Sequence, residues 1–259
     1  MKKLLTFAAV FAALMMGFSA CTPEDQPTDK PGTEQTPGDE TPGDETPGDE
    51  TPGDSDEYES PIVIDGKFDD WAAMDPAKVA VAECHPEATL GGLKVLKVYA
   101  DEFFVNVYIK IDMDFIEPES TPFHVYLDAD NSAETGGYGD EFAEAVSEWS
   151  FEGHIMDGGV FCSYDPGLYP WSGEVGADGW EWIDNIMEGG LATGDGANDE
   201  YEFAISREML GETVTFAEVF GIGVDIQDSG WESVGILPND AVTESNTGGK
   251  APLLRVTVY

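Results

Sequence analysis

Hydrophobic and polar residues alternate along two neighbouring segments of the chain. In residues 104–112 every second position is β-branched and apolar, and Asn106, Tyr108 and Lys110 lie between these positions. A period of two residues is typical of a half-buried β-strand. Residues 93–100 alternate similarly, and Asp101-Glu102 separates the two runs. The pattern therefore predicts a β-hairpin.

Most of the remaining apolar runs are also short and bounded by Gly-rich or Asp-rich breaks. They cover residues 123–127, 149–156, 160–164, 180–186, 201–205, 220–226, 231–236 and 253–259. One helical turn is expected at Ser206–Leu210, between a capping serine and Gly211, and residues 140–147 fit either a helix or a strand. Many strands without regular helices predict an all-β fold, an antiparallel β-sandwich of jelly-roll or immunoglobulin-like type.

The first 21 residues have the order of a secretory signal, with two lysines followed by an apolar run that ends at Cys21. The sequence Phe18-Ser19-Ala20-Cys21 resembles a bacterial lipoprotein signal, although leucine is commoner at the first position. The resemblance implies that Cys21 is acylated, which would place the protein in the cell envelope, at the outer membrane facing outward or in the periplasm. The alternative is an ordinary secretion signal in which the cysteine is incidental.

Residues 22–60 form an acidic linker. They contain fourteen acidic residues and one lysine, and the unit Thr-Pro-Gly-Asp-Glu begins at Thr36, Thr41 and Thr46, with a shortened copy at Thr51. Such a segment cannot bury enough apolar surface to offset its loss of entropy on ordering. We expect a disordered tether that reaches further than the roughly 35 Å of a flexible coil of this length.

Residues 61–259 are expected to form a single domain, because all-β domains often have this length. The whole chain has a net charge of −42, and no lysine or arginine occurs between Ile111 and Ser206. Because nucleic acid and anionic surfaces are bound through clustered basic residues, this charge excludes them. A neutral ligand, a cation or a protein partner is expected. Cys84 and Cys162 either form a disulfide or remain as buried thiols.

Several short motifs occur in an order that resembles family 9 carbohydrate-binding modules and the wider DOMON-like group. They are IVIDGKFDDW at 62–71, YADE at 99–102, LDADN at 127–131 with TGGY at 135–138, and YEFAIS at 201–206. The resemblance implies a β-sandwich over nearly all of residues 61–259. Trp71, after two aspartates, is expected to close one end of that sandwich as a structural residue.

A candidate cation site follows one of the predicted strands. Asp128 and Asp130 come directly after apolar residues, with Asn131 and Glu134 as weaker candidates, and no base lies near them in the sequence. Ca²⁺ is bound by six to eight such oxygens, and the family often carries structural calcium. The alternative is an Asp-rich turn held by its own backbone hydrogen bonds. We expect a stabilising Ca²⁺.

Three tryptophans are the candidate ligand contacts. Trp171, Trp180 and Trp182 lie in a segment rich in glycine and acids, and flat rings beside carboxylates suit a neutral sugar. Trp180 and Trp182 share one strand face, so at least one of them is expected in the core.

No catalytic motif is present in the sequence, which lacks Gly-x-Ser-x-Gly, His-Glu-x-x-His and a phosphate-binding loop, and its three histidines show no ligand spacing. We therefore predict a protein that is not an enzyme. Two kinds of protein remain as alternatives. One is a tethered module that binds a neutral carbohydrate, and the other is a structural or adhesion component of a surface protein assembly.

Overall fold

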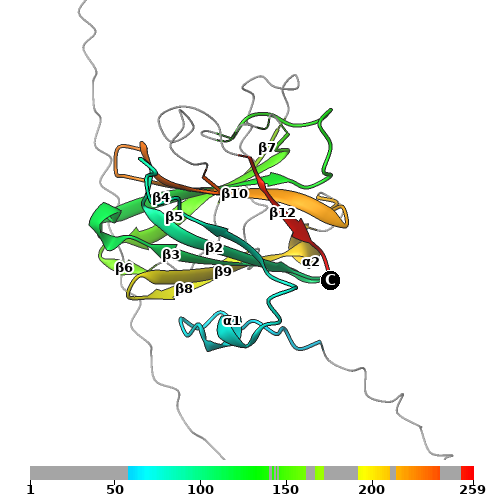
Figure 1. Cartoon of the computed structure of the whole chain (residues 1–259), viewed down its shortest axis with the longest axis horizontal. Coiled ribbons are helices and arrows are strands. Elements are labelled where there is room, and N and C mark those ends of the chain that lie inside the picture. The colour runs from blue at the N-terminus through cyan, green and yellow to red at the C-terminus, as the bar shows by residue number, and fades with distance from the viewer. Residues whose placement is uncertain are drawn as a thin grey trace, which may run out of the picture. The chain divides into compact units, whose positions relative to one another are not determined.

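Two antiparallel β-sheets face each other in the computed structural model of this chain (Figure 1). The structure describes residues 58–139, 142, 144, 146–161, 167–171, 192–210, 214–239 and 252–259. This architecture confirms the predicted all-β sandwich.

One sheet has five strands in the order β1-β2-β3-β9-β8. Its strands are β1 (Ala80–Glu83), β2 (Leu93–Ala100), β3 (Phe104–Ile111), β8 (Ala192–Ala197) and β9 (Glu200–Ser206). The predicted hairpin is confirmed as β2 and β3, which pair with Val98 opposite Val107. The hairpin forms because alternate apolar residues of both strands face the same side.

The other sheet has seven strands. β11, β10, β4, β5 and β6 follow one another, β12 pairs with β10, and β7 pairs with β5. Its strands are β4 (Ser120–Asp128), β5 (Trp149–Asp157), β6 (Val160–Phe161), β7 (Gly167–Pro170), β10 (Val219–Gln227), β11 (Ser233–Leu237) and β12 (Leu254–Thr257). The helical elements are α1 (Asp69–Ala73), the 3-10 turn η1 (Met113–Phe115) and α2 (Arg207–Leu210).

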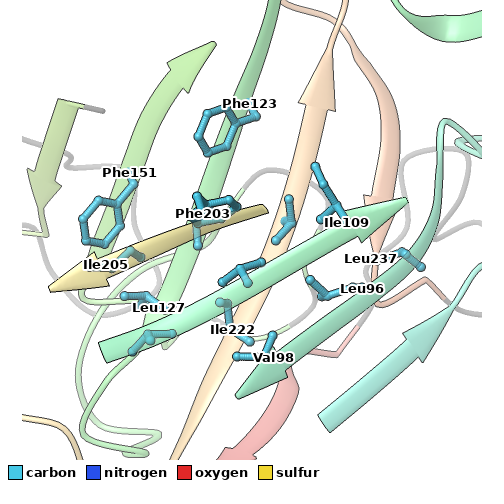
Figure 2. Close-up of a cluster of buried hydrophobic side chains, with 14 of the residues drawn as sticks. Leu96, Val98, Ile109, Phe123, Leu127, Phe151, Phe203, Ile205, Ile222 and Leu237 are labelled. Atoms are coloured by element: carbon cyan, nitrogen blue, oxygen red, sulfur yellow. The ribbon is translucent and has the colours of Figure 1, made fainter. Parts of the chain in front are cut away.

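The main core lies between the sheets (Figure 2). Leu96 and Ile109 of the five-stranded sheet and Phe151 and Ile222 of the seven-stranded sheet are completely buried there. Burial of each such side chain contributes about 1.5–3 kcal/mol. Since successive strand residues point to opposite faces, the residues between the core positions lie on the outer faces of the two sheets.

The outer face of the five-stranded sheet is covered by the segment that contains α1, which Figure 1 shows outside the layer of β8 and β9. Trp71 of α1 packs against Tyr108, and its Nε1 donates to Glu202 Oε2 at 2.8 Å. Glu202 is fully buried and also accepts the backbone N–H groups of Asp65 and Gly66. Trp71 is therefore structural, as expected, but it covers a sheet face and does not close an end of the sandwich.

Other differences concern short or weakly patterned segments. The pattern did not predict β1, β7 or β8, and β11 begins at Ser233, two residues after the predicted start at Trp231. The helical turn is confirmed as α2. The predicted strand at 180–186, residues 162–164 and half of 140–147 lie outside the described residues.

Two further findings concern cysteines and membrane helices. The thiol of Cys84 is free, while Cys162 and Cys21 lie outside the described residues. Within the described ranges no helix has both the length and the apolar character needed to span a membrane.

Candidate functional site

The outer face of the seven-stranded sheet carries most of the candidate chemistry. Phe123, Val125 and Leu127 of β4 belong to the core, so His124, Tyr126 and Asp128 point outward. The residues opposite them on the neighbouring strands are therefore also on this face. They are Gly221, Gly223 and Asp225 on β10, and Ser150 and Glu152 on β5. Beyond β5, Tyr169 of β7 lies opposite Ser150.

A second apolar cluster covers part of this outer face. Tyr126 is buried there with Phe142, Val146, Ile236 and Leu253. Phe142 packs over Gly223, where an added Cβ would lie only 2.5 Å from the phenyl ring. The glycine of β10 therefore makes room for an aromatic ring from the segment between β4 and β5.

Three carboxylates meet where β4 ends and β5 begins. Each of Asp128, Asp130 and Glu148 offers an oxygen, and these oxygens all lie within 4.8 Å of one another. Asp128 is 1% exposed, Glu148 is half-buried and Asp130 is exposed. The sequence nominated the two aspartates, but it gave no reason to add Glu148, which lies eighteen residues further along the chain.

Hydrogen bonds within the loop hold these acids together. Ser132 N donates to Asp128 Oδ1 at 3.3 Å and to Asp130 Oδ1 at 2.9 Å. Thr135 Oγ1 lies 3.0 Å from Asp130 Oδ2 and 3.1 Å from Glu148 Oε1. The loop therefore has the self-bonded geometry of an Asp-rich turn, which is the alternative that the sequence left open.

The charges of the site are only partly balanced. Arg255 Nη1 donates to Asp128 Oδ2 at 2.6 Å, and its Nη2 donates to Glu144 Oε2 at 2.6 Å. Burial, followed by the charges of Asp130 and Asp128, raises the pKa of Glu148 to about 7. Hydrogen bonds from Ala129 N and Thr135 oppose that shift but do not cancel it. A further cation would therefore relieve repulsion among the three acids.

The donor set fits a hard cation in part. Asp128, Asp130 and Glu148 supply carboxylate oxygens, the ligands that Ca²⁺ prefers, but Arg255 already engages one oxygen of Asp128. Asn131 and Glu134 are exposed and lie outside this group. Asn131 has a φ of 53°, which lets the chain turn after β4.

Of the three candidate tryptophans, the structure describes Trp171 alone. It follows β7, is half-buried, and its backbone N–H donates to Glu148 O at 2.7 Å. A Cβ on Gly137 would lie 2.5 Å from the Trp171 ring, so the ring packs directly against that glycine. Trp171 therefore lies beside the acidic loop, whereas Trp180 and Trp182 lie outside the described residues.

A second polar group on the same face was not predicted from the sequence. His124 Nε2 lies 3.4 Å from Glu152 Oε2, and His124 Nδ1 lies 3.3 Å from Gln227 Nε2. The hydrogen bond from His124 lowers the pKa of Glu152, against the opposing effect of burial. The alternation of β4 places His124 on the outer face, but the partners come from strands far apart in the sequence, so no local pattern signals them.

The fold is thus an antiparallel β-sandwich with polar and aromatic side chains on one outer face. In comparisons with known proteins, no family model matches the chain, and no curated protein matches it.

Proposed function

We propose that this protein is a lipid-anchored component of the cell envelope whose β-sandwich binds a neutral carbohydrate and is stabilised by Ca²⁺. The observation that carries the proposal is the outer face of the seven-stranded sheet, where half-buried aromatic rings lie beside side chains that form hydrogen bonds. The resemblance to family 9 carbohydrate-binding modules points to the same ligand class.

The chemistry of this face suits a sugar. A sugar ring has apolar C–H faces edged by hydroxyl groups, and each hydroxyl can both donate and accept. Trp171 and Tyr169 are half-buried on the face, and such rings combine a large apolar surface with a polar edge. Glu152 supplies an acceptor for hydroxyls, and His124 lies against it and helps to hold it in place. Trp180 and Trp182 remain candidates for the same role.

The charge of the chain supports an uncharged ligand. With a net charge of −42, the protein as a whole repels anions. Because Glu152 keeps its charge through a lowered pKa, an anionic sugar would meet repulsion at the face itself.

The proposed Ca²⁺ would be held by Asp128, Asp130 and Glu148. When bound, the ion supplies positive charge that reduces the repulsion among the three carboxylates. It would fix the loop that packs against Trp171, and so its role would be structural. Stabilisation by an ion that binds only the folded state grows with its concentration above the dissociation constant.

The anchor and tether set where the site is presented. Acylation of Cys21 would hold the protein at a membrane, and the linker at 22–60 would keep the sandwich away from the lipid surface. Replacement of Cys21 by serine is expected to move the protein from the membrane fraction to the soluble fraction after centrifugation. Retention of the C21S variant in membranes would contradict lipidation.

Carbohydrate binding can be tested directly with soluble laminarin, xylan, galactomannan and dextran. Isothermal titration calorimetry and intrinsic tryptophan fluorescence are measured with each polysaccharide in the presence of Ca²⁺. We expect saturable binding to at least one of them. If none binds, the proposal fails and the alternative, a structural or adhesion component of a surface protein assembly, is favoured.

A further inference from the structure

We propose that Trp231, with the polar group around His124, forms a contact site for one unit of a neutral polyhydroxylated ligand on the outer face of the seven-stranded sheet. The ligand class rests on the proposed function, but the location does not, because the sequence motifs nominated Trp171, Trp180 and Trp182 and not Trp231.

Trp231 is exposed and held in an unfavourable backbone conformation. It is 47% exposed and has a φ of 64°, a region that large side chains rarely adopt. It lies between β10 and β11. Glycine or asparagine would satisfy such a backbone at lower cost. The turn itself therefore gives no reason for a tryptophan here, and strained residues of this kind cluster at functional sites.

Hydrogen bonds to Asp228 fix the position of Trp231. The Trp231 N–H donates to Asp228 O at 2.9 Å, and Asp228 Oδ1 accepts from Gly230 N at 2.8 Å and from Glu232 N at 3.1 Å. Across the turn, Asp228 N donates to Glu232 O at 3.0 Å. The indole is thus carried on a well-bonded turn, which lowers the entropy lost when a ligand stacks on it.

The indole reaches the two histidines of the outer face. Its ring centroid lies 6.2 Å from that of His124 on β4 and 5.8 Å from that of His154 on β5. His154 is half-buried, and the side chain of Glu152, on the same face of β5, is 31% exposed. An exposed ring and accessible polar side chains therefore lie next to each other.

A buried layer of polar side chains supports this accessible layer. Asp225 is completely buried and accepts from Gln227 Nε2 at 3.0 Å and from Ser233 Oγ at 2.8 Å. Since the Gln227 amide nitrogen only donates, the Nδ1 of His124 beside it is the acceptor, and the His124 proton lies on Nε2 toward Glu152. This chain of contacts runs from buried Asp225 to half-buried Glu152 and orients the histidine.

The buried polar side chains lower the stability of the fold, and one of their hydrogen bonds is not made. Gln227 is 4% exposed, and among the described residues its Oε1 has no hydrogen-bond partner. An unpaired buried carbonyl destabilises the fold, and apolar side chains in place of buried charges are often neutral or stabilising. This oxygen has almost no exposed surface, so a ligand hydroxyl that enters beside His124 would supply the missing donor only with a shift of the Gln227 side chain. The Gln227 side chain lies beside His124, so this observation, which is independent of Trp231, concerns the same polar group.

The groups around His124 limit the ligand class. The Glu152 carboxylate and the Gln227 amide oxygen are acceptors, whereas the His124 N–H already faces Glu152. A hydroxyl can donate to such acceptors, and an anion cannot. Stacking on Trp231 adds an apolar contact that suits the C–H face of a sugar ring.

The test measures binding of laminarin, xylan, galactomannan and dextran by isothermal titration calorimetry. The protein is the full chain, kept in detergent. The W231G variant removes the ring and suits the backbone, so it is expected to keep or raise the melting temperature while weakening binding at least tenfold. The Q227M variant, which removes the amide at similar volume, is expected to weaken binding about fivefold. The control Y259A removes another aromatic ring, 47% exposed and outside this group, and should bind like wild type.

Each outcome separates this inference from the proposed function. If wild type binds a polysaccharide and W231G and Q227M bind it equally well, this site is wrong and carbohydrate binding stands. If W171A loses binding and W231G does not, the Trp231 site is likewise wrong and carbohydrate binding stands. If no polysaccharide binds, both proposals fail. Binding of tetramethylammonium in place of polysaccharides would show a cation site and overturn the ligand class. If W231G does not fold, W231N, which also suits this backbone, repeats the test.

Discussion

The half-buried carboxylate of Glu148 should make stability depend on pH in a direction that calcium reverses. Burial and the charges of Asp130 and Asp128 raise its pKa to about 7 from an ordinary value of 4.5. Between these two pH values the folded protein retains a proton that the unfolded chain has lost. The contribution of Glu148 to the free energy of unfolding therefore falls as the pH rises through this window.

The magnitude follows from the same shift. A pKa of about 7 in place of 4.5 corresponds to at most about 3 kcal/mol at pH 8. Glu148 is only half-buried, so solvent screening lowers the expected effect to about 1–2 kcal/mol. In the E148Q variant this cost is absent. Without calcium at pH 8, E148Q is expected to be more stable than wild type by that amount, and near pH 4 the difference should be close to zero.

Calcium should reverse the difference in stability, so that wild type becomes more stable than E148Q. An ion held by Asp128, Asp130 and Glu148 would keep Glu148 ionised in the folded state and remove the repulsion. At about one hundred times the dissociation constant, bound calcium contributes about 2.7 kcal/mol to wild type. E148Q lacks one carboxylate of the three and should lose most of this gain.

The assay is urea unfolding followed by circular dichroism from pH 4 to pH 8, with chelator or with Ca²⁺. The control variant is E134Q, which removes an exposed acid of the same loop that lies outside the group. E134Q should follow wild type under every condition. The pH argument is refuted if E148Q is less stable than wild type at pH 8 with chelator. The calcium proposal is refuted if wild type shows no response to the ion.

Two further predictions concern packing on the outer faces of the sheets. The W71F variant removes the indole N–H that donates to buried Glu202, which should lower the free energy of unfolding by about 1.5–3 kcal/mol in urea; a loss below about 0.5 kcal/mol would contradict the role given to that bond. The G137A variant places a Cβ 2.5 Å from the Trp171 ring and should lower the melting temperature by an amount equivalent to about 1–3 kcal/mol. In the control G91A the new Cβ makes only ordinary contacts of 3.4 Å or more, and a melting temperature equal to that of G137A would refute the packing argument.

The alternation of apolar residues predicted the strands whose two faces differ most. β3 has one face of valine and isoleucine in the core and another of polar or amphipathic residues, so its two-residue period was plain. β7 and β8 contain glycine, proline and small residues, and their strand conformation depends on pairing with β5 and β9. Such strands are fixed by tertiary hydrogen bonds, which local sequence does not encode.

The candidate site residues also include some that the sequence could predict and others that only the fold reveals. Asp128 and Asp130 could be nominated because two acids follow one strand within three residues. Glu148 joins them only because β5 pairs with β4 and starts beside the loop. Trp231 was assigned to a strand from its apolar neighbours, and only its positive φ and its exposure identify it as a surface residue. Convergence of distant strands and backbone strain are both consequences of the complete fold.

The two outer faces differ in a way that bears on presentation of a ligand. On the five-stranded sheet, Ile62 and Trp71 bury Tyr99 and Tyr108, so the described part of the chain begins by covering that face. On the seven-stranded sheet, the side chains of Glu152 and Trp231 remain accessible. Because the sheets pack face to face, these outer surfaces are on opposite sides of the sandwich. The segment at 62–71 therefore covers the side of the sandwich opposite the candidate ligand face.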